Sequence, residues 1–261
     1  MIVERIWTGN SLRNYNYLVA CPETGEALAI DPLDHEKCLA LARERGFQIT
    51  QILNTHEHRD HTGGNGHVVQ ATSAKLLAHA RAAIPDVDRG LNAGDVVRVG
   101  KTVELEVLDT PGHTMSHVCL LSHTDQPALF SGDTLFNAGA GNCRGGGHPV
   151  ELYRTFSAQL AALPAETILQ PGHDYIERNL AFTLDREPDN RVAQDFLERV
   201  RGHDPAKAST TTLGIEKEIN AFFRLQSPTI IAKLRAQFPD LPNALDDQAV
   251  FLKLRELRNS W

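Results

Sequence analysis

The first two-thirds of the chain alternates short apolar runs with polar segments, and this pattern predicts strands separated by helices and loops. The strand-like runs cover residues 17–19, 27–30, 49–53, 103–108, 128–130 and 167–169. Between the second and third runs, Asp34 is placed to cap a helix that continues to Arg45 and stops at Gly46. The alternation of strands with helices predicts an α/β domain over residues 1–173.

The pattern changes after residue 173, where apolar positions recur at helical spacing. The expected helices cover residues 174–184, 190–201, 215–223, 229–237 and 246–257. Prolines at 188, 205, 228, 239 and 242 separate or flank them. We therefore expect a second, α-helical domain over residues 174–261, which packs against the first and contributes to substrate binding.

Candidate metal ligands follow four of the strand-like runs. The run 49–53 leads into the segment THEHRDH, from Thr55 to His61, and three later runs each lead to one further histidine or aspartate. The candidate ligands are His56, His58, Asp60, His61, His113, Asp133 and His173. Because side chains at strand ends lie on one rim of a sheet, these separated segments can converge on one site.

Histidine and carboxylate side chains are the usual protein ligands of zinc, iron and manganese. One tetrahedral ion cannot use the whole THEHRDH cluster together with the later ligands, whereas two ions can. Within the cluster, His56 and His58 can reach one metal while Asp60 and His61 reach a second. The sequence therefore predicts a two-metal hydrolase, because paired cations generate hydroxide at neutral pH.

Composition narrows the class of protein. The chain has 261 residues and a formal net charge of −7, and this acidic balance argues against nucleic acids and anionic membranes as main partners. No apolar stretch approaches the roughly 20 residues that span a bilayer, and the N-terminus lacks the layout of a signal peptide. The four cysteines form no CxxC pair, so we expect free thiols and a cytoplasmic protein.

The ligands resemble, in order and in context, those of the metallo-β-lactamase superfamily. The matching motifs are His56-x-His58-x-Asp60-His61, then Pro-Gly-His113-Thr, Ser-Gly-Asp133-Thr and Pro-Gly-His173. The resemblance implies an αββα sandwich, in which two mixed sheets lie between helices. The expected helical C-terminal domain would be an addition to that sandwich.

Three features narrow the resemblance to glyoxalase II, the hydroxyacylglutathione hydrolases. They are Gly132-Asp133-Thr134-Leu135-Phe136 before Ala138-Gly139, Gly172-His173-Asp174-Tyr175 before Asn179-Leu180-Ala181-Phe182, and Asn220-Ala221-Phe222-Phe223-Arg224. The last is similar to the family's Asn-Pro-Phe-x-Arg. The resemblance covers nearly the whole chain and implies hydrolysis of the thioester S-D-lactoylglutathione to a 2-hydroxy acid and glutathione.

The resemblance also implies a role for each ligand. By it, one metal is bound by His56, His58 and His113, a second is bound by Asp60, His61 and His173, and Asp133 bridges the two. Asp60 and Asp133 are the expected catalytic residues, together with a bridging hydroxide that attacks the thioester carbonyl. The two divalent ions are expected to be zinc, iron or both, and manganese also fits these ligands.

Fewer residues point to the substrate contacts. Tyr175 and Arg224 match positions with which the family holds glutathione, and arginine can grip a carboxylate with two hydrogen bonds. Asn142-Cys143-Arg144 stands where the family usually has Lys-x-Tyr, and Ser227 stands in place of a lysine. Asn142 and Arg144 are therefore candidate substrate contacts. These departures leave open a related hydrolase of a non-glutathione thioester or a lactone.

Two further functions stay open. An iron-dependent persulfide dioxygenase shares this fold but uses one iron, so the complete second ligand set argues against it. A non-catalytic binding module usually lacks some ligands, and none is missing here.

Several other residues carry weaker expectations. Asp31 and Asp109 stand at strand ends, where they could orient ligand histidines. Cys143 is expected to be a spectator. We expect most of the remaining histidines to be ordinary polar residues of the core or the surface. His148, in the glycine-rich loop near the candidate site, is the best candidate for a functional role among them. The remaining histidines are His35, His67, His79, His117, His123, His148 and His203.

Overall fold

Two β-sheets face each other in the computed structural model, which describes residues 1–124, 126–208, 210–242 and 244–261. The strands are β1 (Ile2–Trp7), β2 (Tyr15–Ala20), β3 (Glu26–Ile30), β4 (Gln48–Leu53), β5 (Lys75–His79), β6 (Arg89–Leu91), β7 (Val96–Val99), β8 (Val103–Asp109), β9 (Val118–Ser122), β10 (Ala128–Gly132), β11 (Leu135–Phe136), β12 (Gly139–Ala140) and β13 (Ile168–Pro171). One sheet has the strand order β1-β2-β3-β4-β5-β6, and the other has the order β13-β10-β9-β8-β7. Strands β11 and β12 pair separately as a hairpin.

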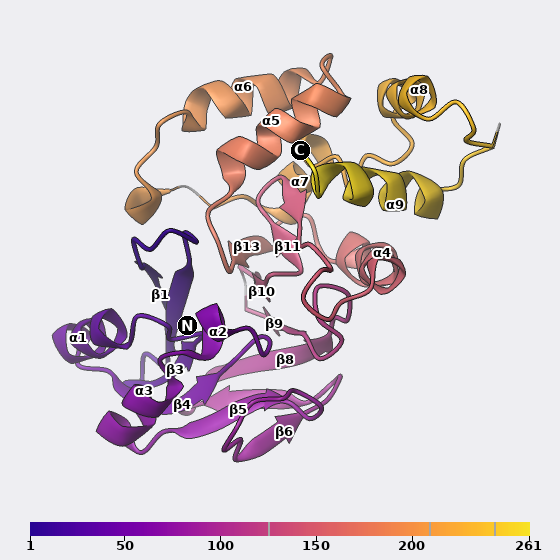
Figure 1. Ribbon diagram of the computed structural model, residues 1–261. Coiled ribbons are helices and arrows are strands. Elements are labelled where there is room, and N and C mark those ends of the chain that lie inside the picture. The colour runs from indigo at the N-terminus through magenta and orange to yellow at the C-terminus, as the bar shows by residue number, and fades with distance from the viewer. Residues whose placement is uncertain (125, 209, 243) are drawn as a thin grey trace.

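Helices cover the outer faces of both sheets (Figure 1). The α-helices of the described residues are α1 (His35–Arg45), α2 (Arg59–Thr62), α3 (Asn65–Thr72), α4 (Pro149–Ala158), α5 (Ile176–Arg186), α6 (Arg191–Val200), α7 (Leu213–Ile219), α8 (Pro228–Gln237) and α9 (Asp247–Arg258). Two short 3₁₀ turns, η1 (Leu160–Ala162) and η2 (Pro205–Lys207), complete the list. The expected helix after Asp34 is confirmed: Asp34 Oδ1 accepts a hydrogen bond from the Lys37 backbone N–H, and Gly46 ends the helix at a φ of 69°.

Apolar side chains on both faces of the central strands build the sandwich. In β9, Val118 and Leu120 face the core between the sheets, whereas Cys119 and Leu121 face the helices behind the second sheet. All four are buried, which explains why such strands are continuous apolar runs rather than alternating ones. Helices α1 and α3 cover the first sheet in the same way. The result is a layered αββα arrangement.

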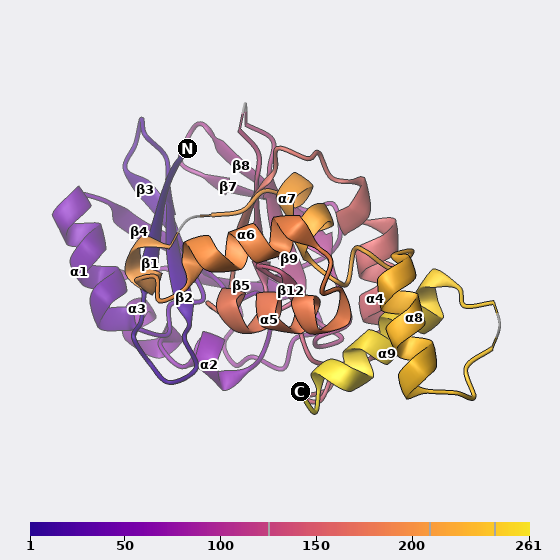
Figure 2. The ribbon, with the colours of Figure 1, turned by 90° about the horizontal axis from the view of Figure 1, so that it is seen from above.

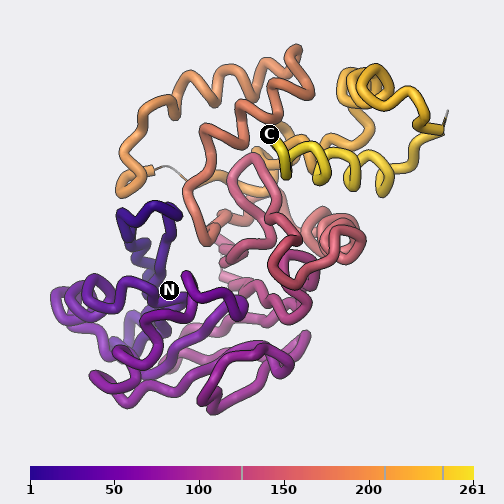
Figure 3. The backbone as a smooth tube through the Cα atoms, viewed as in Figure 1, coloured from indigo at the N-terminus to yellow at the C-terminus, as the bar shows by residue number. Residues whose placement is uncertain are grey.

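The C-terminal helices gather at one end of the molecule (Figures 1 and 2). Figure 3 shows the orange and yellow helices lying together beyond the two sheets, while the orange segment around η2 reaches the first sheet, where the Tyr15 hydroxyl donates to the Pro205 carbonyl. The expected helix over 215–223 is wrong at its end, because α7 stops before Asn220. The Asn220 side chain accepts from the Phe222 N–H and donates to the Gly139 carbonyl, which favours a turn there. Within the described ranges, no helix is long and apolar enough to cross a bilayer.

Strand direction brings the ends of four strands to one rim. Strand β9 is antiparallel to both β8 and β10, and β10 is parallel to β13, so β8, β10 and β13 run the same way. The first sheet reaches the same rim through Asn14, which forms an isolated bridge with His173. The segments that follow β4, β8, β10 and β13 therefore meet where the two sheets approach each other.

Candidate metal centre

The first group of candidate ligands follows β4 directly. His56 is fully buried, and His58 lies at the start of the single-turn helix α2, which carries Asp60 and His61. Asn54 holds this turn in place, because its side chain donates to the backbone carbonyl of His61 at 3.0 Å. A rigid strand followed by one helical turn thus presents four side chains to the rim.

The remaining ligands arrive from the second sheet. His113 follows β8, Asp133 follows β10, and His173 follows β13. Gly132, just before Asp133, has a φ of +46°, and a Cβ there would lie 2.6 Å from Thr55 Oγ1. Only glycine fits this close approach, which lets the chain turn sharply and aim the Asp133 carboxylate inward.

Three histidines form the first ligand set. His56 Nε2 and His113 Nε2 each lie 3.0 Å from His58 Nδ1. The three nitrogen atoms lie within 4.8 Å of one another, a spacing at which one metal ion can bind all three.

A second ligand set lies beside the first. His61 Nε2 and His173 Nε2 are 3.2 Å apart, and Asp60 Oδ2 is 3.6 Å from the former and 3.5 Å from the latter. These atoms also lie within 4.8 Å of one another. The two sets are those that the family resemblance implies for two metals.

Asp133 lies between the two sets. Its Oδ1 is 3.3 Å from His61 Nε2, while its Oδ2 is 3.2 Å from His173 Nε2 and 3.5 Å from His113 Nε2. The side chain is buried, and Oδ1 has no well-formed hydrogen bond in the described residues. A buried carboxylate oxygen without a hydrogen bond is costly unless a cation meets it.

The far nitrogen of every ligand histidine faces a hydrogen-bond acceptor. The pairs are His56 Nδ1 with Thr55 Oγ1 (3.0 Å), His58 Nε2 with Gly145 O (2.9 Å), His61 Nδ1 with Asp31 Oδ2 (2.9 Å), His113 Nδ1 with Asn142 O (2.6 Å) and His173 Nδ1 with Leu12 O (2.7 Å). If each far nitrogen carries the proton, the facing nitrogens carry only lone pairs. Lone pairs about 3 Å apart repel one another unless a cation lies between them. The donor set therefore fits two metal ions.

Burial supports this protonation pattern at two of the ligand histidines. Burial lowers the pKa of His56 well below its ordinary value and also lowers the pKa of His113, so both imidazoles are neutral at neutral pH. Burial alone would raise the pKa of Asp133, but the neighbouring His173 and His61 outweigh it and hold that pKa well below its ordinary value. Asp133 is thus an ionised carboxylate beside the neutral His56 and His113. At His61 burial alone would lower the pKa, but the Asp133 and Asp31 carboxylates outweigh it and raise that pKa well above its ordinary value.

The sequence analysis missed two residues that orient the ligands. His117, expected to be ordinary, is fully buried, stacks on His56 with ring centroids 5.1 Å apart, and accepts the Asp133 backbone N–H at 3.1 Å. Asn14 donates to Asp60 Oδ2 at 3.1 Å. Neither stands at a strand end with a ligand motif, so no local pattern marks them.

Of the two aspartates expected to orient histidines, Asp31 does so and Asp109 does not. The Asp31 carboxylate accepts from Thr55 Oγ1 at 2.7 Å and from the Thr55 N–H at 2.8 Å, in addition to its contact with His61. Asp109 instead lies 3.5 Å from His79, which belongs to neither ligand set.

Three of the four candidate substrate residues line one cavity beside the metal centre. Asn142, Arg144 and Tyr175 border a space of about 320 Å³. The Tyr175 ring stacks on His173, with centroids 5.0 Å apart. Burial, and then the nearby Asp133 and Asp60 carboxylates, raise the pKa of Tyr175, so its hydroxyl stays protonated. The wall of the cavity thus contacts the second ligand set through Tyr175.

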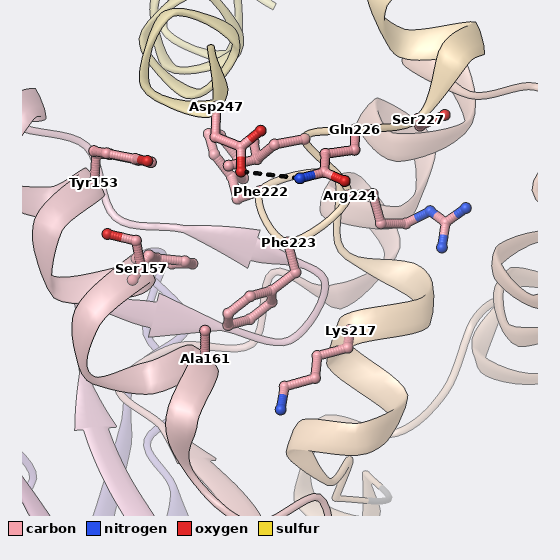
Figure 4. A pocket seen from close by; sticks show the side chains of 12 residues that line it. Tyr153, Ser157, Ala161, Lys217, Phe222, Phe223, Arg224, Gln226, Ser227 and Asp247 are labelled. Atoms are coloured by element: carbon pink, nitrogen blue, oxygen red, sulfur yellow. Dashed lines mark hydrogen bonds between the residues drawn. The ribbon is translucent and has the colours of Figure 1, made fainter.

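Arg224, the fourth candidate, is not among the residues that line that cavity. Its guanidinium donates to both carboxylate oxygens of Glu187, at 2.5 and 2.7 Å, and Ser227 Oγ donates to the same carboxylate at 2.6 Å. Figure 4 shows a separate cavity of about 410 Å³, from which the Arg224 side chain points away while Phe223 points inward. The sequence could not show this partner, because Glu187 carries no motif.

Cys143 and His148 lie near the metal centre but on its outer side. Both border a cavity of about 460 Å³ next to α9. Burial raises the pKa of the Cys143 thiol to about 11, so the reactive thiolate is scarce at neutral pH. His148 precedes α4 and its backbone N–H donates to the Gly112 carbonyl. The spectator role expected for Cys143 fits this environment.

Comparison with known proteins places the chain in a family. Residues 15–176 match the model of the metallo-β-lactamase superfamily, and residues 174–261 match that of the hydroxyacylglutathione hydrolase C-terminus. Two relatives named hydroxyacylglutathione hydrolase, from Polaromonas sp. strain JS666 and Nitrosococcus oceani, are 68% and 63% identical over 100% of both chains.

Solved structures agree with this placement. ETHE1 from Myxococcus xanthus superposes with a TM-score of 0.68 at 26% identity, over 98% of this chain and 99% of that one. TTHA1623 in a di-iron-bound form superposes with a TM-score of 0.60 at 28% identity, over 84% of this chain and 99% of that one. The expected αββα fold and the expected metal-binding hydrolase are confirmed. The chain belongs to the hydroxyacylglutathione hydrolase family of the metallo-β-lactamase superfamily.

Proposed function

We propose that this protein is a binuclear metal-dependent thioesterase that cleaves S-D-lactoylglutathione and related 2-hydroxyacylglutathiones to a 2-hydroxy acid and glutathione. One observation carries the proposal: two three-residue ligand sets meet at a single carboxylate, that of Asp133. A carboxylate has two oxygens and can serve two ions at once. The names of the relatives support the glutathione thioester and favour neither a lactone nor persulfide oxidation.

In this proposal His56, His58 and His113 would hold one divalent ion, Asp60, His61 and His173 would hold the other, and Asp133 would serve both. Zinc, iron or both are the proposed metals, and manganese fits the same donors. When bound, such a pair polarises a carbonyl and lowers the pKa of water toward neutrality. The thioesterase needs no protein nucleophile.

The residues of the chain itself orient the reaction. The Asp60 side chain is 26% exposed and is held by Asn14, so it can accept a hydrogen bond from the attacking water. The water oxygen bonds to the carbonyl carbon, the carbon–sulfur bond breaks, and the thiolate leaves and takes up a proton. Phe136 and Tyr175 both contact His173 and form an apolar wall beside that step.

We further propose that residues 1–173 form the catalytic domain and residues 174–261 a helical domain that completes the substrate site. The proposed setting is the cytoplasm, and the substrate is a small molecule rather than a nucleic acid or a membrane. The free cysteines support a reducing setting, since Cys21, Cys38 and Cys119 are buried and none of the four is in a disulfide.

The test is hydrolysis of S-D-lactoylglutathione by protein loaded separately with zinc, iron or manganese. Released thiol and metal content per chain are measured on the same samples. The proposal expects rapid thiol release with about two metals per chain. Two bound metals with no thiol release would overturn the substrate, and full activity with a single bound metal would overturn the binuclear mechanism.

A further inference from the structure

Glu57 stands between two metal ligands in the sequence but belongs to neither ligand set. Its neighbours His56 and His58 are both members of the first set. The Glu57 carboxylate instead accepts two hydrogen bonds through Oε2, from Thr114 Oγ1 at 3.1 Å and from Ser116 Oγ at 2.8 Å. A carboxylate inside the ligand motif is thus engaged with a different segment of the chain.

The two hydroxyls that bind Glu57 belong to the loop between β8 and β9, residues 110–117. This loop also carries His113, the third histidine of the first ligand set. Strand β8 lies in the second sheet, whereas β4, which leads into the segment 56–58, lies in the first. The first ligand set is therefore drawn from both sheets, and the side chain of Glu57 joins the two segments that supply it.

Both hydroxyls are buried, which strengthens the contact. Thr114 is fully buried and Ser116 is 6% exposed, so water competes little for their hydrogen bonds. Hydrogen bonds to a carboxylate are roughly twice as strong as those between neutral groups. Loss of the Glu57 carboxylate would leave two buried donors without this acceptor, which is costly. The loop is therefore held in the one position that keeps both bonds.

A backbone hydrogen bond joins the same two segments nearer to the sheets. The Val118 N–H donates to the Thr55 carbonyl at 2.8 Å. Thr55 precedes the ligand motif, and Val118 is the first residue of β9, so this bond fixes the base of both segments. The bonds of Glu57 lie further out, at Thr114 and Ser116, and fix the part of the loop that directly follows His113.

The second ligand set provides the contrast, because it takes no member from this loop. Its members are Asp60, His61 and His173. A movement of the loop would change the distance between His113 Nε2 and His58 Nδ1, which is 3.0 Å, within the first set. The same movement would leave the spacing of the second set as it is. The contact of Glu57 therefore bears on one of the two sets.

We infer that Glu57 is a positioning residue, which holds the loop of His113 against the segment of His56 and His58 and thereby raises the affinity of the first ligand set for its metal. Glu57 does not bind that metal, because its Oε2 is turned to the two hydroxyls and it belongs to none of the ligand groups. The inference rests on the proposed function, because it assumes that a metal binds at the first set. Residues that hold metal ligands in place typically contribute 10–100-fold in metal affinity.

The test is a titration of the metal-free protein with cobalt(II), in a chelator buffer that sets the free metal concentration. Cobalt(II) is paramagnetic and shifts the proton NMR signals of the imidazole N–H groups on the histidines that bind it. The first set has three histidines and the second has two, so the two sets give groups of three and two shifted signals. In Glu57→Ala the group of three should need at least about tenfold more free cobalt(II) to appear. The group of two should appear as in the wild-type protein.

Three further variants separate the contact from a simple loss of charge. Ser116→Ala removes one hydrogen bond and keeps the charge of Glu57, and it should weaken the first set by about threefold. The double variant Glu57→Ala with Ser116→Ala should be no weaker than Glu57→Ala alone, because both changes remove the same contact. Glu44→Ala, on the exposed side of α1, is the matched control for the loss of one negative charge and should leave both sets unchanged.

Unchanged affinity of the first set in Glu57→Ala would overturn the inference. An equal loss at both sets, or additive effects of the two changes, would also overturn it, since either result shows a general effect of charge or stability. If Glu57→Ala does not fold, Ser116→Ala decides alone, because it removes only one small hydroxyl. Failure of the proposed function looks different: the wild-type protein itself would then bind cobalt(II) without the group of three signals, and the inference would fall with the first metal site.

Discussion

The metal centre lies beside a cavity, here called the arginine pocket, whose lining includes Arg144, Arg178, Arg255 and Arg258. The two sites have opposite electrostatic needs. At the metal centre, histidine nitrogens whose far sides face acceptors point at one another about 3 Å apart, so the site needs cations. In the arginine pocket, guanidinium groups border a cavity with no acidic lining residue, so the site needs an anion. One molecule with an acidic end and a reactive carbonyl would satisfy both.

The difference shows how the two kinds of site are built. The metal centre is assembled from strand ends, and each ligand is fixed by a second hydrogen bond to the scaffold. The arginine pocket is assembled from a loop and two helices. Among the described residues, Arg144, Arg178 and Arg258 each make one hydrogen bond to a neutral group, and Arg258 also lies over the rings of Phe182 and Trp261. We therefore expect the metal centre to depend on how rigidly its ligands are held, and the arginine pocket to depend on its positive charge.

The strongest test of the metal centre is Asp133→Ala. This change removes the carboxylate that lies between both ligand sets, so bound metal should fall and kcat should drop on the order of 10³-fold or more. Metal analysis and steady-state hydrolysis on the same preparation measure both effects. The matched control is Asp195→Ala on exposed α6, which should retain metal and turnover. Metal content and kcat close to wild type would show that the two sets do not depend on Asp133.

Asp31→Asn tests whether the hydrogen bonds on the far side of the ligand histidines contribute to metal affinity. Asp31 has a φ of 49°, a conformation that asparagine tolerates well, so the backbone should be unaffected. The variant loses the negative charge that holds His61 Nδ1, and metal affinity should fall about 10–100-fold. Competition with a chelator measures the affinity. Saturating metal should restore most of the turnover, whereas unchanged affinity would argue against a role for Asp31.

Helix α7 contains a buried acid, Glu216. It accepts from the Ala138 N–H, from Thr211 and from Asn220, and burial raises its pKa to about 7. Its folded pKa lies above the unfolded value of about 4.3, so the folded protein holds this proton more tightly. The resulting stability is complete at low pH and is lost as the pH rises toward and through 7.

Glu216→Gln removes this titration while keeping a similar shape. Relative to wild type, the variant should gain about 2 kcal/mol in free energy of unfolding between pH 5 and pH 8. Urea unfolding of both proteins at each pH measures the difference, and taking the difference cancels the other titrating groups. A constant difference across that range would mean that Glu216 keeps an ordinary pKa.

The sequence predicted the metal centre far better than the arginine pocket, for a physical reason. The candidate metal ligands are histidines and carboxylates in segments that follow strand-like runs, and this pattern located all seven candidates that the structure brings together. The arginine pocket needs only charge at a suitable distance, so residues from α5 and α9 meet there without any motif. Arg144 was found only through its resemblance to a family position.

The prediction of secondary structure from the sequence was also limited to what a local pattern can show. The runs that form β4 and β10 were predicted, whereas β6, with only three residues, carries too little pattern to be seen. The prediction also missed four longer strands: β1, β5, β7 and β9. The end of α7 was missed because Asn220 makes contacts to Gly139, far away in the chain. Local patterns thus locate many of the strands, helices and ligands, whereas contacts between residues far apart in the chain determine features such as the end of α7.

The smallest effects should come from two arginine variants, Arg224→Gln and, smaller still, Arg154→Gln. We consider Arg224→Gln first. This change leaves the Glu187 carboxylate, which is 5% exposed, with only Ser227 and Asn190 as side-chain partners. Because Arg224 is itself about a third exposed, the free energy of unfolding should fall by only about 1–2 kcal/mol. Arg154→Gln, which breaks the exposed pair with Glu151, should cost less than about 0.5 kcal/mol. Urea unfolding compares the two, and KM for S-D-lactoylglutathione should be unchanged in both. A rise in KM with unchanged stability would instead make Arg224 part of the cationic site and remove the distinction between the two arginine groups.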